Sequence, residues 1–403
     1  MTEGLRIALV HLRQSGTGGT ERYLNQMARY LCERGHEVTI VCRSHEAAPH
    51  TDARFVTLRS PVIGATWRMW AFARAVEQHV VAAGYDVVFG LGKAWSHDII
   101  RLGGGCHATY LELAHDHTRS SWERASGRGQ LKQRVALTIE DRALRRGAYR
   151  RVIVNSEMVK RDAVARHGIP PELVHVIYNG VDLERFQRRR HRQAARVLRL
   201  QCGFAESDVV VLFLGTGYGR KGLQRLLHAF ALVAPSQPRL RLLVVGYDSE
   251  QRAYHHQAAA LGLARVARFL GGRRDAEVCY AASDLYALPT YYDPFANSTL
   301  EALASGLPVI TTATNGGAEV LNLSAGSIVD ESTGSLVAEL MRWGDRDRIE
   351  QARPSARVIA ERYPQNLTTE LSTLVLEAVA MEKRIDGQRR RNHRVEVRDS
   401  GAS

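Results

Sequence analysis

The fold is decided by one stretch in the middle of the chain, Val209-Val210-Val211-Leu212-Phe213-Leu214-Gly215-Thr216-Gly217-Tyr218-Gly219-Arg220-Lys221-Gly222. It begins with an unbroken apolar run, which is typical of a buried strand, and continues into a glycine-rich turn. Leu223–Val233 then repeats apolar residues with the period of a helix, and Leu240–Gly246 is a second apolar strand. A strand, a helix and a strand in this order build a parallel sheet.

The same pattern occurs at the start of the chain. Leu5–Val10 is an apolar strand, Ser15–Thr20 is a turn that contains Gly18 and Gly19, and a helix and a strand at Val38–Cys42 follow. Further strands are expected at Phe55–Leu58, Asp86–Gly90, Ile99–Leu102, Arg151–Asn155, Ala267–Leu270, Asp284–Ala287 and Pro308–Thr311, and further helices at Asp275–Ala282 and Ser298–Ser305. The sequence therefore predicts an α/β protein of two facing, doubly wound, Rossmann-like domains with a ligand cleft between them.

An arginine-rich polar stretch, Arg188–Arg199, separates the two halves. We expect an N-terminal domain at residues 1–187 and a C-terminal domain at residues 188–365. Residues 366–382 are expected to form a helix that packs back on the N-terminal domain. Residues 383–403 are basic and poor in apolar side chains, so they predict a disordered tail.

Composition limits the class of partner. The chain has 403 residues, 45% of them hydrophobic, and 55 Lys and Arg against 42 Asp and Glu give a net charge of +13. Such a charge favours an anionic partner: a phosphate-bearing molecule, a membrane surface or a nucleic acid. The five cysteines are scattered without any C-x-x-C pair, which favours a reducing compartment over a disulfide framework or a zinc ribbon. Without an apolar run long enough to span a membrane, the sequence predicts a cytoplasmic protein.

The turn Gly215–Gly222 permits two functional interpretations. Gly217, Gly219 and Gly222 fit G-x-G-x-x-G, so an NAD(P)-dependent oxidoreductase is the alternative hypothesis, with Asp248 just past the next strand. Arg220 and Lys221 inside the turn favour instead a concentrated charge such as a pyrophosphate. A tight structural turn with a solvated Arg-Lys pair explains the same residues without any ligand.

A pair of acidic residues, Asp293 and Glu301, flanks the expected start of the helix at Ser298–Ser305. Either Asn297 or Ser298 can cap this helix, and backbone amides at a helix start can bind a phosphate oxygen. A carboxylate is a good acceptor for paired sugar hydroxyls. The structural explanation of Glu301 is that an acidic residue stabilises the positive end of a helix.

These motifs together resemble the family 4 retaining glycosyltransferases of the GT-B fold, and among them the lipopolysaccharide core glucosyltransferase I group. Asp293-x7-Glu301 resembles the E-x7-E signature of that family. The resemblance also rests on Gly18-Gly19-Thr20-Glu21-Arg22, Val154-Asn155-Ser156, Ile177-Tyr178-Asn179-Gly180-Val181-Asp182, Phe186, Gly219-Arg220-Lys221-Gly222 and Glu301-Ala302-Leu303-Ala304-Ser305-Gly306-Leu307-Pro308-Val309-Ile310.

The resemblance implies a role for each matching residue. Arg220 and Lys221 would bind the donor diphosphate, and Glu301 the ribose hydroxyls. Asp293 would contact the donor sugar, although the family usually has the longer Glu there. The remaining donor-binding residues would be Gly18 and Gly19, Arg273 near the base, and the loop residues Phe295, Ala296, Asn297 and Ser298.

His107 matches the place of a histidine in the cleft of many relatives, and Asp98 is the competing polar candidate. The resemblance implies catalysis by Asp293, His107, Lys221 and Arg220 without a metal ion or another cofactor. Asp345-Arg346-Asp347, which has the D-x-D form, is interpreted as a surface feature.

The resemblance further implies transfer of a hexose, with glucose from UDP-glucose favoured, to a lipopolysaccharide core or a similar membrane-borne glycan. The basic segment Arg119–Arg151 is expected to touch the anionic cytoplasmic face of the inner membrane, unless it is only a solvated helix face. This would make the protein a peripheral membrane enzyme. A nucleic-acid partner is not expected, since the chain has no recognisable binding module.

Overall fold

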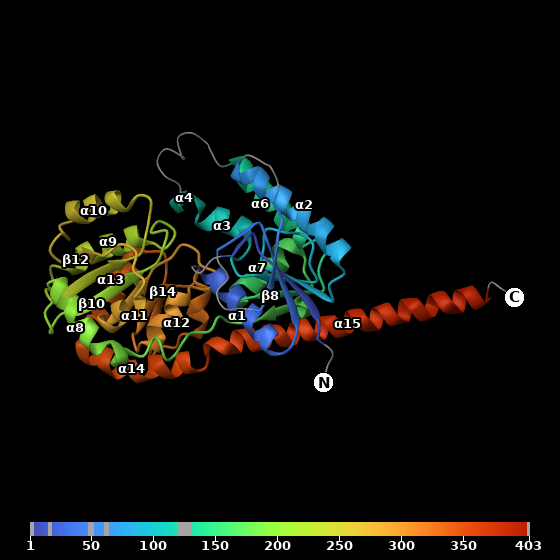
Figure 1. Cartoon of the computed structure of the whole chain (residues 1–403). Helices are drawn as coiled ribbons and strands as arrows, with labels where there is room; N and C mark the ends of the chain where they lie inside the picture. Colours follow the sequence, from blue (N-terminus) through green and yellow to red (C-terminus); the bar gives the residue numbers. More distant parts are fainter. Residues whose placement is uncertain (1–3, 15–17, 47–51, 60–63, 119–129, 401–403) are drawn as a thin grey trace.

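The computed structural model describes residues 4–14, 18–46, 52–59, 64–118 and 130–400. Figure 1 shows two α/β domains side by side, with helix α15 (Gln365–Ser400) running beneath the N-terminal domain and projecting beyond it. Each domain is a parallel sheet covered by helices. The predicted fold class, two Rossmann-like domains in the GT-B arrangement, is confirmed.

The N-terminal domain is built on a sheet with the strand order β5-β3-β1-β6-β7-β8-β9. Its strands, with the short parallel pair β2 and β4, are β1 (Arg6–Val10), β2 (Arg13–Gln14), β3 (Glu37–Cys42), β4 (Ser44–His45), β5 (Arg54–Thr57), β6 (Val87–Gly90), β7 (Ile99–Leu102), β8 (Arg151–Val154) and β9 (Val174–Val176). Its helices are α1 (Gly19–Glu33), α2 (Ala65–Ala83), α3 (His107–Leu113), α4 (His115–Thr118), α6 (Gln130–Ala143), α7 (Glu157–His167) and the 3₁₀ turn η1 (Pro171–Leu173).

The C-terminal domain repeats this plan with the strand order β12-β11-β10-β13-β14-β15. Its strands are β10 (Val209–Leu214), β11 (Leu240–Val245), β12 (Ala267–Phe269), β13 (Leu285–Leu288), β14 (Val309–Thr312) and β15 (Gly326–Val329). Its helices are η2 (Arg188–His191), α8 (Arg192–Gln201), α9 (Leu223–Val233), α10 (Gln251–Ala260), α11 (Ala276–Ala281), α12 (Asn297–Ala304), η3 (Gly316–Val320), α13 (Thr333–Trp343) and α14 (Arg346–Glu361).

The arginine-rich stretch expected to separate the domains folds as η2 and α8. Arg188 and Arg199 of this stretch lie 3.5 and 3.1 Å from the buried carboxylate of Asp284, and Arg353 of α14 lies 2.9 Å from it. Arg188 and Arg199 also donate to the backbone carbonyls of Ser283 and Ala282, just after α11. This stretch is therefore part of the C-terminal domain rather than a linker.

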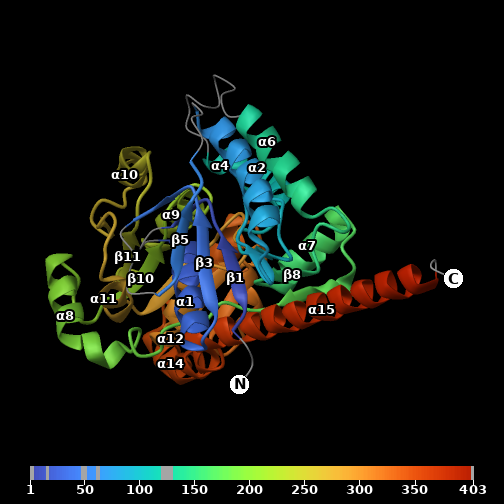
Figure 2. The ribbon, with the colours of Figure 1, turned by 45° about the vertical axis from the view of Figure 1, so that its right-hand side comes forward.

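The chain crosses between the domains twice, and the two crossings touch. The backbone N–H of Val181 donates to the carbonyl oxygen of Tyr363 at 2.9 Å. After the second crossing, α15 packs on α1, and its residues Leu376, Val379 and Ala380 join the apolar core of the N-terminal domain. Figure 2 shows the same helix along the lower edge of the N-terminal domain.

The prediction of a disordered tail at residues 383–403 is wrong for its described part, because α15 continues to Ser400. The basic side chains at its start are not simply solvated. Lys383 pairs with Asp98 at 2.7 Å, Arg384 with Asp86 at 3.6 Å, and Asp386 accepts from Arg150 at 3.0 Å. These ion pairs to the N-terminal domain extend the helix beyond its apolar part.

Candidate active site

The turn after β10 and the loop after β13 meet in a buried cluster of charges. Nη1 of Arg220 and Nζ of Lys221 each donate to Oδ2 of Asp293 at 2.8 Å. Burial by itself would raise the pKa of Asp293, but Lys221 and Arg220 outweigh burial and hold the pKa at about 2. Asp293 is therefore ionised at neutral pH, and it holds both cations at one point.

Backbone geometry accounts for the glycines of this turn. A Cβ on Gly215 would lie 2.4 Å from Cδ of Lys221. Gly222 has φ +78°, and a Cβ there would lie 1.9 Å from the carbonyl oxygen of Pro289. Glycine is needed at both positions to pack the turn, so the glycines alone do not identify an anion site. The identification depends on the two cations between them.

Glu301 on α12 faces α1 of the other domain. Its Oε2 accepts from the hydroxyl of Tyr280 at 2.9 Å, and its Oε1 lies 3.8 Å from Nη1 of Arg22. A Cβ on Gly19, the first residue of α1, would lie 3.3 Å from Nδ2 of Asn297. The starts of α1 and α12 thus meet between the domains.

The expectation that Asn297 or Ser298 caps α12 is wrong. The helix begins at Asn297 with Ala296 at the capping position, and no side chain accepts a capping hydrogen bond. Both expected caps have other partners: Oδ1 of Asn297 accepts from Asn179 at 2.6 Å, and Oγ of Ser298 accepts from Tyr286 at 2.7 Å. Tertiary partners therefore take the oxygens that a cap would use.

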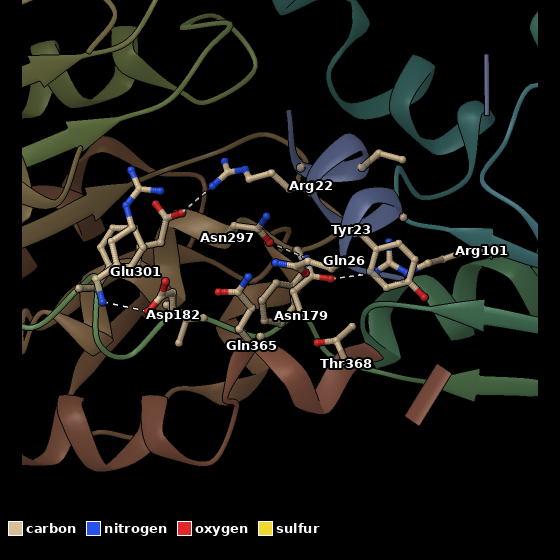
Figure 3. A pocket seen from close by; sticks show the side chains of 18 residues that line it. Arg22, Tyr23, Gln26, Arg101, Asn179, Asp182, Asn297, Glu301, Gln365 and Thr368 are labelled. Carbon is tan, nitrogen blue, oxygen red and sulfur yellow. Dashed lines mark hydrogen bonds and ion pairs between the residues drawn. The ribbon is translucent and has the colours of Figure 1, made fainter. Parts of the chain in front are cut away.

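A cavity of about 280 Å³ lies between the domains, next to these helix starts (Figure 3). Four residues expected to bind the donor line it: Gly19, Phe295, Asn297 and Glu301. The other lining residues are Thr20, Arg22, Tyr23, Gln26, Arg101, Gly103, Asn179, Gly180, Val181, Asp182, Arg185, Phe186, Gln365 and Thr368. The Arg220–Lys221–Asp293 cluster is not part of the lining.

The remaining candidates lie elsewhere. Gly18 precedes α1 and accepts from the backbone N–H of Arg22 at 3.1 Å. Ala296 is buried beside Ser298. Arg273 lines a separate surface cavity and pairs with Asp275 at 2.6 Å.

His107 begins α3 in the N-terminal domain and does not line the cavity. Its Nε2 lies 2.7 Å from Oε1 of Gln133 on α6, a hydrogen bond within that domain. Burial, and after it the charge of Lys93, lowers the pKa of His107. The competing candidate, Asp98, pairs with Lys383 and accepts from the backbone N–H of Val88 at 2.9 Å, which is a structural role.

Sequence reasoning missed the residues that join the two domains around the cavity. Nη2 of Arg101 on β7 donates to Oδ1 of Asn179 at 2.7 Å, and Asn179 donates to Asn297. Farther along, the carboxylate of Glu319 on η3 accepts from the first two backbone N–H groups of α7, those of Glu157 and Met158, at 2.8 and 2.7 Å. Asn179 stood in a quoted motif, but neither Arg101 nor Glu319 was predicted to be a site residue.

Comparison with known families covers both domains. The family described as Glycosyltransferase Family 4 matches residues 17–185, and the family described as Glycosyl transferases group 1 matches residues 197–357. The chain belongs to the family 4 glycosyltransferases of the GT-B fold. These matches do not support the alternative of an NAD(P)-dependent oxidoreductase. In the transferase, Asp248 accepts from the backbone N–H of Tyr218 at 2.7 Å and so holds the glycine turn.

The transferase is similar to characterised relatives over most of its length. It is 25% identical to the lipopolysaccharide glucosyltransferase WaaG of Escherichia coli K12, over 80% of this chain and 82% of the relative. It is 28% identical to the D-inositol 3-phosphate glycosyltransferase of Streptomyces bingchenggensis, over 76% and 72% of the two chains.

Solved structures share the fold of the transferase. A crystal structure of WaaG superposes with a TM-score of 0.77 at 22% identity, covering 92% of this chain and 99% of that one. Anabaena HepE in complex with UDP and glucose superposes with a TM-score of 0.69 at 22% identity, covering 93% of this chain and all (100%) of that one.

Two kinds of feature are absent from the described part of the transferase. No group of three or more His, Cys, Asp or Glu side chains is placed there to hold a metal ion. No helix in the described ranges has the length and apolarity needed to cross a bilayer. Asp345 accepts from the backbone N–H of Asp347 and caps α14, as expected of a surface D-x-D.

Proposed function

We propose that the transferase moves a hexose, glucose from UDP-glucose, to a lipopolysaccharide core or similar membrane-borne glycan, with retention of the anomeric configuration and without a metal ion. The observation that carries this proposal is the position of Arg220, Lys221 and Asp293 at the carboxyl ends of β10 and β13. Nucleotides bind at this edge of a doubly wound sheet.

The ion-pair cluster supplies the chemistry of the donor site. A diphosphate is a stronger attractor for Arg220 and Lys221 than one carboxylate, so both cations can turn from Asp293 to the donor. Negative charge develops on the departing diphosphate in the transition state, which is oxocarbenium-like as in glycoside hydrolysis. Fixed cations lower that barrier. Asp293, released from its partners, then faces the sugar, while Glu301 binds the ribose hydroxyls.

The relatives support the donor and the acceptor. WaaG is named a lipopolysaccharide glucosyltransferase, and a solved structure of HepE contains UDP-glucose. On the acceptor side, the basic segment Arg119–Arg151 would meet an anionic bilayer at the cytoplasmic face of the inner membrane. Residues 119–129 of that segment lie outside the described residues.

The test is titration calorimetry with UDP, GDP and ADP in buffer that contains a chelator. We expect UDP to bind at least tenfold more tightly than the other two. Glu301→Gln and Lys221→Met should each weaken UDP binding at least tenfold, because each removes a charged partner. Glu361→Gln is the matched control, since Glu361 pairs only with Arg357 on the surface of α14.

Transfer itself is followed with UDP-glucose and truncated lipopolysaccharide, and the anomeric configuration of the product is read by NMR. An α-linked product from the α-linked donor is expected. If neither Glu301→Gln nor Lys221→Met changes the affinity for UDP, the proposed donor site is refuted. A β-linked product would refute retention of the anomeric configuration.

A further inference from the structure

Arg101 is a buried cation without a buried anion beside it. It lies on β7, is 5% exposed and lines the cavity between the domains (Figure 3). Its guanidinium lies 4.0 Å from the ring centroid of Tyr23, and Nη2 donates to Asn179. Its Nε is buried without a hydrogen-bond partner among the described residues. No carboxylate in the described ranges forms an ion pair with it.

Such an arrangement is costly by itself. A guanidinium has five N–H donors, and burying its charge without a counter-ion is strongly unfavourable. The stacking on Tyr23 offsets only part of this cost. The backbone also makes room for the group, because a Cβ on Gly103 would lie 2.5 Å from Nη1 of Arg101.

The acidic side chains that line the cavity do not neutralise Arg101. Glu301 is bound by Tyr280 and Arg22. Oδ1 of Asp182 accepts from the backbone N–H groups of Glu184 and Arg185 at 3.1 and 2.9 Å. The positive charge of Arg101 therefore has no carboxylate partner among the described residues.

We propose that Arg101 anchors an anion subsite for a phosphate or carboxylate group of the acceptor. The amide side chains of Gln26 and Gln365 line the same cavity and can donate to such a group. This inference rests on the proposed function in one respect. If Arg220 and Lys221 hold the donor diphosphate, the anion at Arg101 belongs to the second substrate.

The experiment titrates inorganic phosphate into the full chain saturated with UDP. Phosphate should bind, and Arg101→Gln should weaken it at least tenfold, which corresponds to about 1.4 kcal/mol. Arg101→Lys keeps the charge and should retain most of the affinity. Arg74→Gln, which removes an exposed arginine on α2, is the matched control and should change nothing. UDP affinity should be the same in all four proteins.

Three results would overturn the subsite: no phosphate binding in the presence of UDP, equal binding by the wild type and Arg101→Gln, or binding that UDP abolishes. The last would assign the phosphate to the donor site. If Arg101→Gln does not fold, Arg101→Lys is compared with Lys221→Met, and loss of phosphate binding only in the latter refutes the proposal.

Failure of the proposed function gives a different pattern. UDP would then not bind to the wild type, and phosphate would be titrated alone. If only Arg101→Gln then loses phosphate binding, the subsite is still supported. If only Lys221→Met loses phosphate binding, the subsite is overturned.

Discussion

Asp293 shows how one carboxylate can organise a site before substrate arrives. A single oxygen atom of its side chain, Oδ2, accepts from both Arg220 and Lys221. The cluster is buried, so its charges depend on one another. Removing any member leaves the others without compensation in a medium of low polarity.

We predict that Asp293→Asn lowers the free energy of unfolding by about 3–5 kcal/mol, the usual cost of removing one partner of a buried ion pair. UDP should then raise the melting temperature more in the variant than in the wild type, because its diphosphate restores the lost negative charge. Thermal unfolding with and without UDP measures both effects.

The control for this prediction is Asp275→Asn, which breaks the more exposed pair with Arg273. Exposed pairs contribute about 0–1 kcal/mol, so this variant should unfold almost as the wild type does. If both variants lose the same free energy of unfolding, the buried cluster around Asp293 is no more stabilising than the exposed pair.

His97 is one of the histidines whose burial makes stability depend on pH. Burial lowers its pKa to about 4 from an ordinary value of 6.5, and its Nε2 lies 3.1 Å from the carbonyl oxygen of Ala143. The unfolded chain binds the proton more readily than the folded one. Stability should therefore fall as the pH drops from 6.5 to 4, by about 1.4 kcal/mol per pH unit at most.

Urea unfolding between pH 7 and pH 4 measures this slope. His97→Gln keeps a donor for Ala143 without a titrating group, so its slope should be flatter in this window. Asp293 contributes little above pH 5, because its stabilisation is lost between its ordinary pKa of 3.8 and its folded pKa of about 2. Parallel slopes for the variant and the wild type would exclude His97 as the cause.

At the scale of elements, α7 is capped by Ser156 of its own domain and is also held at its start by the other domain. Glu319 on η3 accepts from the first two N–H groups of α7 and from the hydroxyl of Tyr178 at 3.1 Å. We predict that Glu319→Gln opens the cleft, because charged hydrogen bonds of about 1.5–3 kcal/mol each become weaker ones. Small-angle X-ray scattering should show a larger radius of gyration.

Glu157→Gln is the matched control for that prediction. It removes the same charge from the first turn of α7, where Glu157 is exposed, and breaks no side-chain bond to the other domain. Scattering curves that coincide for the two variants would mean that Glu319 does not hold the domains together.

Element positions were largely predictable from the apolar pattern. Ile99–Leu102, Val209–Leu214 and Leu223–Val233 were predicted with the bounds that the structure has. The start of α12 and the end of α15 were not, because both depend on side-chain partners far away in the sequence. Asn297 is taken by Asn179, and Lys383 by Asp98. The local sequence pattern does not reveal contacts between residues that are far apart in the chain.

The candidate site was predictable to a similar degree. Arg220, Lys221 and Asp293 were expected at one ligand, and the structure brings them together. Arg101 was not expected, since a cation within an apolar strand gives no sign of whether it is buried. Its environment comes from α1 and from the first crossing between the domains.

At the scale of the whole molecule, only some of the basic side chains behind the net charge of +13 are free to meet an external anion. Within Arg119–Arg151, Arg150 and Arg151 are occupied by Asp386 and Glu382 of α15. Arg145 and Arg146 are exposed beyond the end of α6. They are therefore better candidates for meeting an anionic surface than their neighbours.

We predict that Arg145→Gln combined with Arg146→Gln weakens binding to vesicles rich in phosphatidylglycerol about tenfold or more, since each cation near the bilayer contributes about 1 kcal/mol. Vesicle co-sedimentation measures this. Arg192→Gln combined with Arg196→Gln on α8 removes the same charge from the other domain. If both double variants lose the same affinity for the vesicles, the effect comes from net charge and not from the segment after α6.

The return of α15 to the N-terminal domain also has a consequence during synthesis. Asp98 and Lys383 are 285 positions apart, and Leu376 fills a core whose other members are mostly made near the start of translation. Domains usually fold in the order in which they leave the ribosome. Here the first domain to emerge is completed only after the second has been made, because the final helix supplies part of its apolar core.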